Sequence, residues 1–150
     1  MKTVFDKTTR DELIKRIQSL DKKSSAQWGK MNVYQMVKHC HSWENWIHGK
    51  DGRTYKQEFI GRVFGKMALR RLTRDDRPLD KKVPTSTWLK IKEQECDLDQ
   101  LKLEWVAFME SYDTYSNPAF IHDFFGKMTP EQIGVLSYKH NDHHLRQFGA

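Results

Sequence analysis

The chain has 150 residues, of which 31% are charged and 37% hydrophobic, and its formal net charge is +6 at pH 7. This length suits one domain, residues 1–150, with a core of its own. No apolar run approaches the roughly 18 residues that span a bilayer, and the N-terminus lacks an apolar signal segment. We therefore expect a cytoplasmic protein with no membrane partner.

The positive charge is densest between Arg62 and Lys82. Clustered Lys and Arg side chains are typical of nucleic-acid binding, because they release counterions from phosphate backbones. Elsewhere in the chain, however, the cations are interleaved with Asp and Glu. We favour a solvated surface that mildly attracts anionic ligands over a nucleic-acid partner.

Cys40 and Cys96 are the only cysteines. Two cysteines in a chain of this size do not make a disulfide framework, and no Cys-x-x-Cys motif occurs. We expect both to stay reduced and to be small core residues rather than reactive thiols. The core should be rich in aromatic residues, since Phe, Trp and Tyr are plentiful.

The first helix is predicted to start near Thr9, because Thr9 and Glu12 have the spacing of a capping box. A second helix is predicted to start at Asn32, an N-cap residue whose capping box Gln35 completes. At about 100° per residue, the inward stripe of this second helix consists of Met36, Cys40, Trp43 and Ile47. His39 and Trp46 lie at the edge of the stripe, whereas His41 and Asn45 point away from it.

A third helix is predicted from Tyr55 to Leu72. Its apolar face comprises Phe59, Val63 and Met67. A neighbouring face carries Arg62, Lys66 and Arg70. A basic amphipathic helix of this kind can lie on anionic lipid, but we favour a solvated helix on the outside of a bundle. The polar, proline-containing stretch from Thr73 to Thr87 is predicted to be a loop.

A fourth helix is predicted from about Gln94 to Tyr112, with a start near Trp88 as the alternative. Its seam has the spacing of a bundle helix and consists of Leu98, Leu101, Trp105, Phe108 and Tyr112. The fifth helix has the strongest cap in the chain. Thr129 suits the N-cap, Pro130 suits the first helical position and Gln132 completes a capping box.

The fifth helix contains the run Tyr138–His144, which holds three of the seven histidines. His140 and His144 are four residues apart, so both imidazoles lie on one face, where the pattern calls for Leu or Ile. Lys139, Asp142 and Arg146 are predicted to lie on the opposite side. Burying an imidazole without a partner is costly, so a metal ion or a hydrogen-bond network must compensate.

His39, from the edge of the second helix's stripe, is the predicted third ligand. Packed helices lie about 8–10 Å apart, so imidazoles from both sides can reach one ion at about 2.0–2.1 Å if it is zinc. We expect a divalent ion, zinc or nickel first and iron or manganese as alternatives. Three histidines leave a coordination position open, as in catalytic sites. Gln35 and Gln147, each one turn from a ligand, can orient the rings.

Other interpretations of the histidines stay open. A single His on an apolar face, such as His39, is more often a hydrogen-bonded core residue than a ligand. We expect the remaining histidines to lie on the surface or beside the site, with His143 as the fourth candidate ligand; they are His41, His48, His122 and His143. No general base is evident, because Glu44 lies off the inward stripe and Asp142 faces outward.

Three segments resemble the DinB/YfiT-like metalloenzyme superfamily: Trp28–Cys40, Phe124–Gln132 and Tyr138–Phe148. The last contains a KHxDHHLRQF-type motif and is the most specific. The resemblance covers nearly the whole chain. It implies an all-α, up-down-down-up four-helix bundle with one additional short helix or long connector, often as a homodimer. The family's metal triad, one His from the second helix and a His-x-x-x-His pair from the last, falls on His39, His140 and His144. Some members act with a low-molecular-weight thiol, and many have no assigned activity.

The leading hypothesis is a metal-dependent enzyme, either a hydrolase or a thiol-dependent transferase, that acts on a small-molecule substrate. The alternative is a non-catalytic, metal-stabilised helical bundle that serves as a binding module. A basic nucleic-acid binder is the third interpretation.

Overall fold

The computed structural model describes residues 1–81, 83, 85–95 and 97–150. These residues form five α-helices and two short 3-10 helices, with no strand among them. The elements are α1 (Lys7–Ser19), α2 (Val33–Ile47), α3 (Phe59–Leu72), η1 (Thr87–Leu89), α4 (Leu98–Ser111), η2 (Tyr112–Thr114) and α5 (Pro130–Gln147). The all-α prediction is confirmed for this part of the chain, and none of its helices is both long and apolar enough to cross a bilayer.

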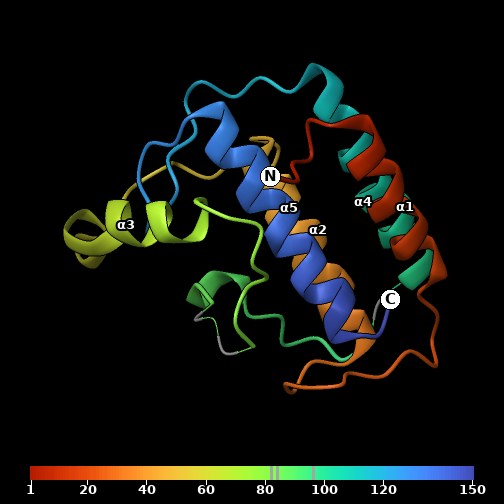
Figure 1. Ribbon diagram of the computed structural model, residues 1–150. Coiled ribbons are helices and arrows are strands. Elements are labelled where there is room, and N and C mark those ends of the chain that lie inside the picture. Colours follow the sequence, from red (N-terminus) through yellow and green to blue (C-terminus); the bar gives the residue numbers. More distant parts are fainter. Residues whose placement is uncertain (82, 84, 96) are drawn as a thin grey trace.

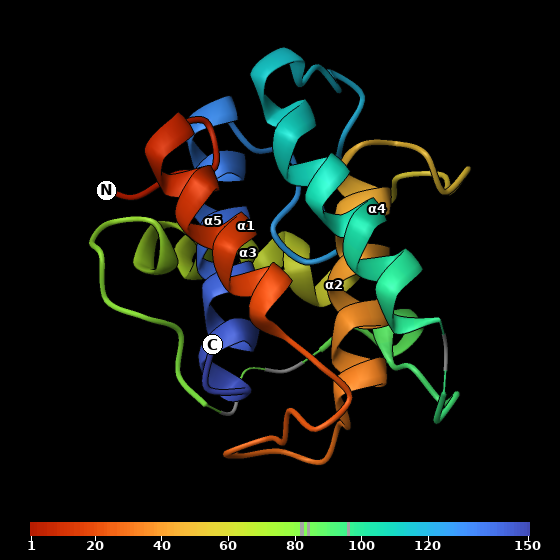
Figure 2. The same cartoon turned by 90° about the vertical axis from the view of Figure 1, so that its right-hand side faces the viewer.

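Four of the helices pack together. α2 contacts α4 and α5, and α1 contacts the same two helices. Figure 1 shows α5 in front of α2, and the turned view in Figure 2 shows α1 and α4 in front of that pair. α3 lies apart from the other helices (Figure 1). The candidate site lies where α2 and α5 pack against each other.

The core is aromatic, as predicted. One cluster of buried residues joins α1, α2, α4 and α5 around Trp105 and Tyr112. A second cluster, around Trp43 and Trp46, adds residues of α3, η1 and the segment before α5. Cys40 is fully buried, which confirms its role as a core residue. Pro84 and Cys96 lie outside the described residues.

Two of the three predicted capping boxes are confirmed. Asn32 and Gln35 cap α2 reciprocally, and α5 has the same arrangement with proline in its first turn. The predicted box at Thr9 is wrong. α1 starts two residues earlier, because the Asp6 carboxylate accepts a hydrogen bond of 2.7 Å from the Thr9 backbone N–H. An aspartate three residues ahead thus takes the capping position that we assigned to the threonine.

Two other helices start later than predicted. α4 starts at Leu98, because the Asp97 side chain accepts from the Gln100 backbone N–H, and the Trp88 region forms the separate turn η1. α3 starts at Phe59 rather than Tyr55. Its buried side consists of Gly61, Gly65 and Leu69. The predicted apolar face of α3 is thus solvent-exposed.

Candidate metal centre

His39 of α2 and the pair His140 and His144 of α5 come together where these two helices pack. The Nε2 atoms of His39 and His140 are 3.0 Å apart. One ring nitrogen from each of the three residues lies within 4.8 Å of the others. The predicted convergence of these histidines is confirmed. Nitrogens bound to one zinc ion are separated by roughly 3–4 Å, so the spacing fits one ion after small side-chain shifts.

Hydrogen bonds behind the rings orient two of the three imidazoles. His39 Nδ1 lies 3.0 Å from the Leu89 carbonyl oxygen, and His144 Nδ1 lies 2.9 Å from Gln147 Oε1. The Gln147 amide is itself held, since its Nε2 donates to the Trp28 carbonyl at 2.7 Å. Because carbonyl and amide oxygens only accept, each Nδ1 must carry the proton. His39 and His144 therefore both present a bare Nε2.

His140 has no such partner. Its ring stacks on Trp43, with centroids 4.2 Å apart and planes 16° apart. Its Nδ1 is buried without a hydrogen-bond partner among the described residues. If Nε2 carries the proton, it can donate to His39, but Nδ1 is then a buried acceptor without a donor. If Nδ1 carries the proton, the bare Nε2 of His140 faces the bare Nε2 of His39.

A divalent cation resolves either conflict, because neutral imidazole binds a metal through its bare nitrogen. His39 and His144 are buried, and His140 is partly exposed. Burial lowers the pKa of all three imidazoles, and for His140 and His144 the neighbouring histidines lower it further. The rings are thus neutral at neutral pH, which is the form that ligates metal.

Comparison with known families places nearly the whole chain in one family. Residues 2–150 match the family described as "Protein of unknown function (DUF1569)". The chain belongs to this family. No curated protein and no solved structure matches it. Since the DUF1569 description names no activity, the function must be argued from the geometry of the site.

Gln147 takes the orienting role predicted for it. Gln35 does not, since no hydrogen bond between the described residues joins it to His39. Gln35 instead caps α2 and donates to the Ile91 carbonyl. Sequence reasoning missed the Leu89 carbonyl, because a main-chain group in a short 3-10 turn has no side-chain pattern. It placed Trp43 on the inward stripe but did not predict that its ring would stack on His140.

Glu44 corrects our prediction that it lies off the inward side of α2. In this DUF1569 protein it is fully buried. Its two carboxylate oxygens accept hydrogen bonds from the Tyr112 hydroxyl at 2.6 Å and from Asn141 Nδ2 at 2.7 Å. Trp105 Nε1 donates to Asn141 Oδ1 at 2.8 Å, and the Tyr112 hydroxyl also lies 2.9 Å from Ser137 Oγ. Burial raises the pKa of Glu44 to about 7, against the two hydrogen bonds, which lower it.

The outward side predicted for α5 is also wrong in part. Lys139 is buried, and its ammonium donates to three backbone carbonyls of residues 72–77 at 2.6–2.9 Å. Asp142 does face a more open region, where it forms ion pairs of 2.9 and 2.8 Å with Arg16 and Arg146. α5 is therefore enclosed on more sides than its pattern indicated.

The other histidines are less exposed than a surface location implies. His122 and His143 are buried, and the His48 side chain is 6% exposed. His48 bonds to the Glu44 carbonyl and Ser111, and burial lowers its pKa to about 4. Only His143 adjoins the triad closely, with its ring 4.9 Å from that of His144. It lies outside the group of converging nitrogens.

Proposed function

We propose that His39, His140 and His144 bind one divalent metal ion and that the protein is a metal-dependent enzyme acting on a small molecule. The observation that carries this proposal is the set of ring nitrogens within 4.8 Å of one another, two of them held bare by hydrogen bonds behind the rings. A buried cluster of this kind is costly without a cation. Zinc or nickel suits three imidazoles, with iron or manganese as alternatives.

We further propose that α1, α2, α4 and α5 form the DinB-like four-helix bundle, with α3 as the additional helix. The packing of these four helices in adjacent pairs supports this assignment. So does the origin of the triad, one histidine from α2 and an i, i+4 pair from α5. Cytoplasmic location and a homodimeric state are parts of the same proposal; the first rests on the lack of a long apolar run in the sequence and the second on the resemblance alone.

The chain's own residues would prepare the site for catalysis. The Leu89 carbonyl and Gln147 set the tautomers of His39 and His144. Trp43 covers one face of the His140 ring. His140 is the member of the triad with partial solvent exposure, so we propose that a substrate approaches beside it. A divalent ion bound here would supply Lewis acidity for hydrolysis or for activation of a low-molecular-weight thiol.

The two carboxylates considered as general bases, Glu44 and Asp142, are both engaged by other residues. Both oxygens of Glu44 are engaged by Tyr112 and Asn141. Asp142 is engaged by two arginines. A reaction in which the nucleophile needs no separate base, as in thiolate transfer, is therefore the better match. The net positive charge favours an anionic substrate or thiol.

A non-catalytic, metal-stabilised binding module is the second candidate. The burial of His39 and His144 favours it, because two of the three rings have little contact with solvent. In that case the metal would stabilise the fold, and the open coordination position would carry no chemistry.

Turnover assays separate the two candidates. Metal-loaded protein should hydrolyse activated esters or conjugate a low-molecular-weight thiol to an electrophilic arene, and His140→Ala should lose that activity. His143→Gln is the matched control, since His143 neighbours the triad but does not belong to it. Metal binding with no turnover of either substrate class, together with a metal-dependent rise in melting temperature, would favour the binding module.

A further inference from the structure

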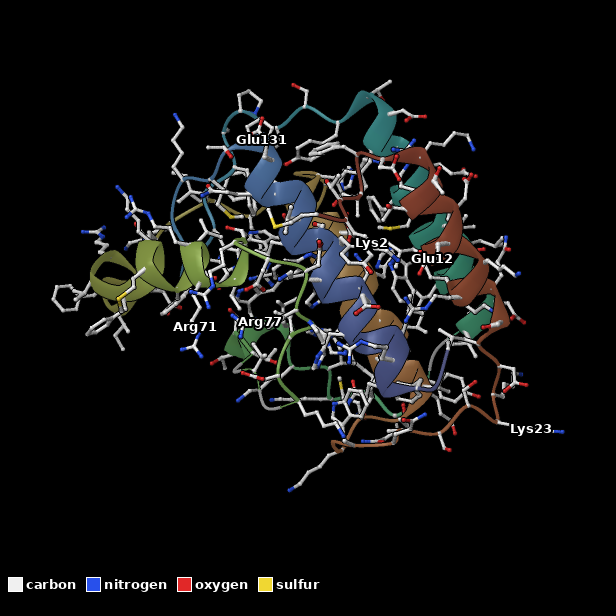
Figure 3. All side chains as sticks on the ribbon, in the orientation of Figure 1. Lys2, Glu12, Lys23, Arg71, Arg77 and Glu131 are labelled. Carbon is white, nitrogen blue, oxygen red and sulfur yellow. The ribbon has the colours of Figure 1, made fainter. Side chains whose placement is uncertain are left out.

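The outer side of α3 is an exposed apolar face. Each of its five large apolar residues is more than half exposed: Phe59, Ile60, Val63, Phe64 and Met67. Phe59 reaches 79% and Met67 68%. Figure 3 shows the side chains on the far side of α3 extending away from the rest of the chain. Contiguous exposed apolar residues on a folded domain mark a contact surface.

The orientation of this face is imposed by close packing on the opposite side of α3. Gly61 and Gly65 lie against the Phe124 carbonyl, and a Cβ at either position would overlap the Phe124 carbonyl oxygen. Before the helix, the Glu58 backbone N–H donates to the Asp123 carbonyl at 2.7 Å. At its last residue, the Leu72 carbonyl accepts a hydrogen bond from the Lys139 ammonium. α3 therefore cannot rotate to bury its apolar residues.

The charges within α3 are of one sign, and the exposed Glu58 directly precedes the helix. α3 contains four cations and no acidic residue: Arg62, Lys66, Arg70 and Arg71. At about 100° per residue, Arg62 and Lys66 follow one edge of the apolar face, and the other two arginines lie at its C-terminal end. Figure 3 shows Arg71 extending from the helix.

A pocket of mixed charge adjoins the N-terminal end of α3. It encloses about 730 Å³, and its charged lining consists of three cations, Arg53, Lys56 and Arg62, and two carboxylates, Glu58 and Asp123. The Arg53 guanidinium lies over the Trp88 ring, 4.1 Å from its centroid. Three cations against two carboxylates leave this lining with a formal charge of +1, so the preference for an anionic surface comes from the cations of α3 itself.

We propose that α3 is a peripheral membrane-binding helix that lays its apolar face into an anionic lipid surface. Apolar residues flanked by Lys and Arg are the pattern of an interfacial helix. Such a helix lies on the surface of the bilayer and does not cross it. The length of the apolar runs argues only against a membrane-spanning helix, so this proposal revises our expectation of no membrane partner.

A second copy of the chain fits the face less well. A 14-residue helix is about 21 Å long and about 10 Å wide, so its face covers on the order of 200 Å². A stable interface buries roughly 800 Å² on each partner. Two copies would also bring four cations of each α3 together. A nucleic acid would match the charge but not the apolar centre of the face.

Vesicle co-sedimentation with the full chain tests the proposal. The protein should bind vesicles of phosphatidylcholine with one-third phosphatidylserine more tightly than vesicles of phosphatidylcholine alone, and high salt should weaken the binding. Phe59→Ser/Phe64→Ser should reduce the affinity at least about tenfold. Arg62→Glu/Lys66→Glu should remove the preference for anionic vesicles.

Leu103→Ser is the matched control, because Leu103 is 67% exposed on α4 and its loss should leave vesicle binding unchanged. All substituted side chains are exposed, so circular dichroism should confirm an unchanged fold. No binding to anionic vesicles at low salt would overturn the proposal, as would equal binding by Phe59→Ser/Phe64→Ser. A dimer that the same double variant dissociates, or salt-sensitive binding to duplex DNA without vesicle binding, would overturn it too.

Discussion

Two buried polar clusters lie between α2 and α5, and they differ in how their hydrogen bonds are satisfied. In the Glu44 cluster, both carboxylate oxygens and the Asn141 and Trp105 side chains have partners of opposite character. In the histidine cluster, like atoms face one another, and His140 Nδ1 has no partner among the described residues. The Glu44 cluster is a complete hydrogen-bond network and stabilises the fold. The histidine cluster places bare nitrogens beside one another, an arrangement that a bound cation would stabilise.

The two clusters are neighbours in sequence as well as in space. His39 and Glu44 are both on α2, and His140 and Asn141 are adjacent on α5. Substitutions in one cluster should therefore change metal affinity, and substitutions in the other should change stability.

The largest expected effect is on metal affinity. His140→Ala removes one of three ligands, so zinc affinity measured by calorimetry should fall about 100-fold or more. His143→Gln should retain the affinity within about twofold, because His143 is outside the converging group. Comparable losses in the two variants would show that the ligand set is misassigned.

Glu44→Ala should lower the free energy of unfolding by about 3 kcal/mol. The substitution leaves the Tyr112 hydroxyl without its carboxylate acceptor and creates a cavity in the core. Urea denaturation of the metal-free protein measures the effect. Metal affinity in Glu44→Ala should stay close to that of wild type, and a large loss would mean that the two clusters are coupled.

The pH dependence of stability should identify Glu44. Its folded-state pKa of about 7 lies above the ordinary value of 4.5, so its protonation stabilises the folded state. This contribution is complete below about pH 4.5 and is lost as the pH rises past about 7, a span of roughly 3 kcal/mol. The free energy of unfolding of wild type, relative to that of Glu44→Gln, should therefore fall as the pH rises over this range. The histidines titrate in both proteins, so their contributions cancel in the difference. Parallel pH profiles would contradict the assignment.

Gln147→Ala should have the smallest effect of the series. It removes the acceptor that orients His144 but none of the ligands, so metal affinity should fall by about tenfold with unchanged stoichiometry. Gln18→Ala, at an exposed position of α1, is the control. A complete loss of binding in Gln147→Ala would imply that Gln147 does more than orient the ring.

Two of the three local capping boxes were predicted correctly, and so was the convergence of the triad. The capping boxes at Asn32 and Thr129 depend on residues three apart in the chain, and both are confirmed. His39, His140 and His144 could be assigned to inward positions because helical periodicity gives each helix a preferred side. The packing distance between helices then paired the two helices, and the resemblance pointed to the same three residues.

Features that depend on tertiary contacts were predicted less well. We gave α2 one inward stripe, but it packs against both α4 and α5, and ten of its 15 residues are buried. Glu44 was misplaced for that reason. α3 was misjudged because two glycines decide its orientation against Phe124, and glycine carries no signal in an apolar pattern.

The most direct test of the central claim is the metal content of untagged protein purified without a nickel column. Elemental analysis should find close to one divalent ion per chain in wild type and in His143→Gln, and almost none in His39→Ala. Metal-free wild type that also fails to bind added zinc or nickel, or an unchanged metal content in His39→Ala, would contradict it.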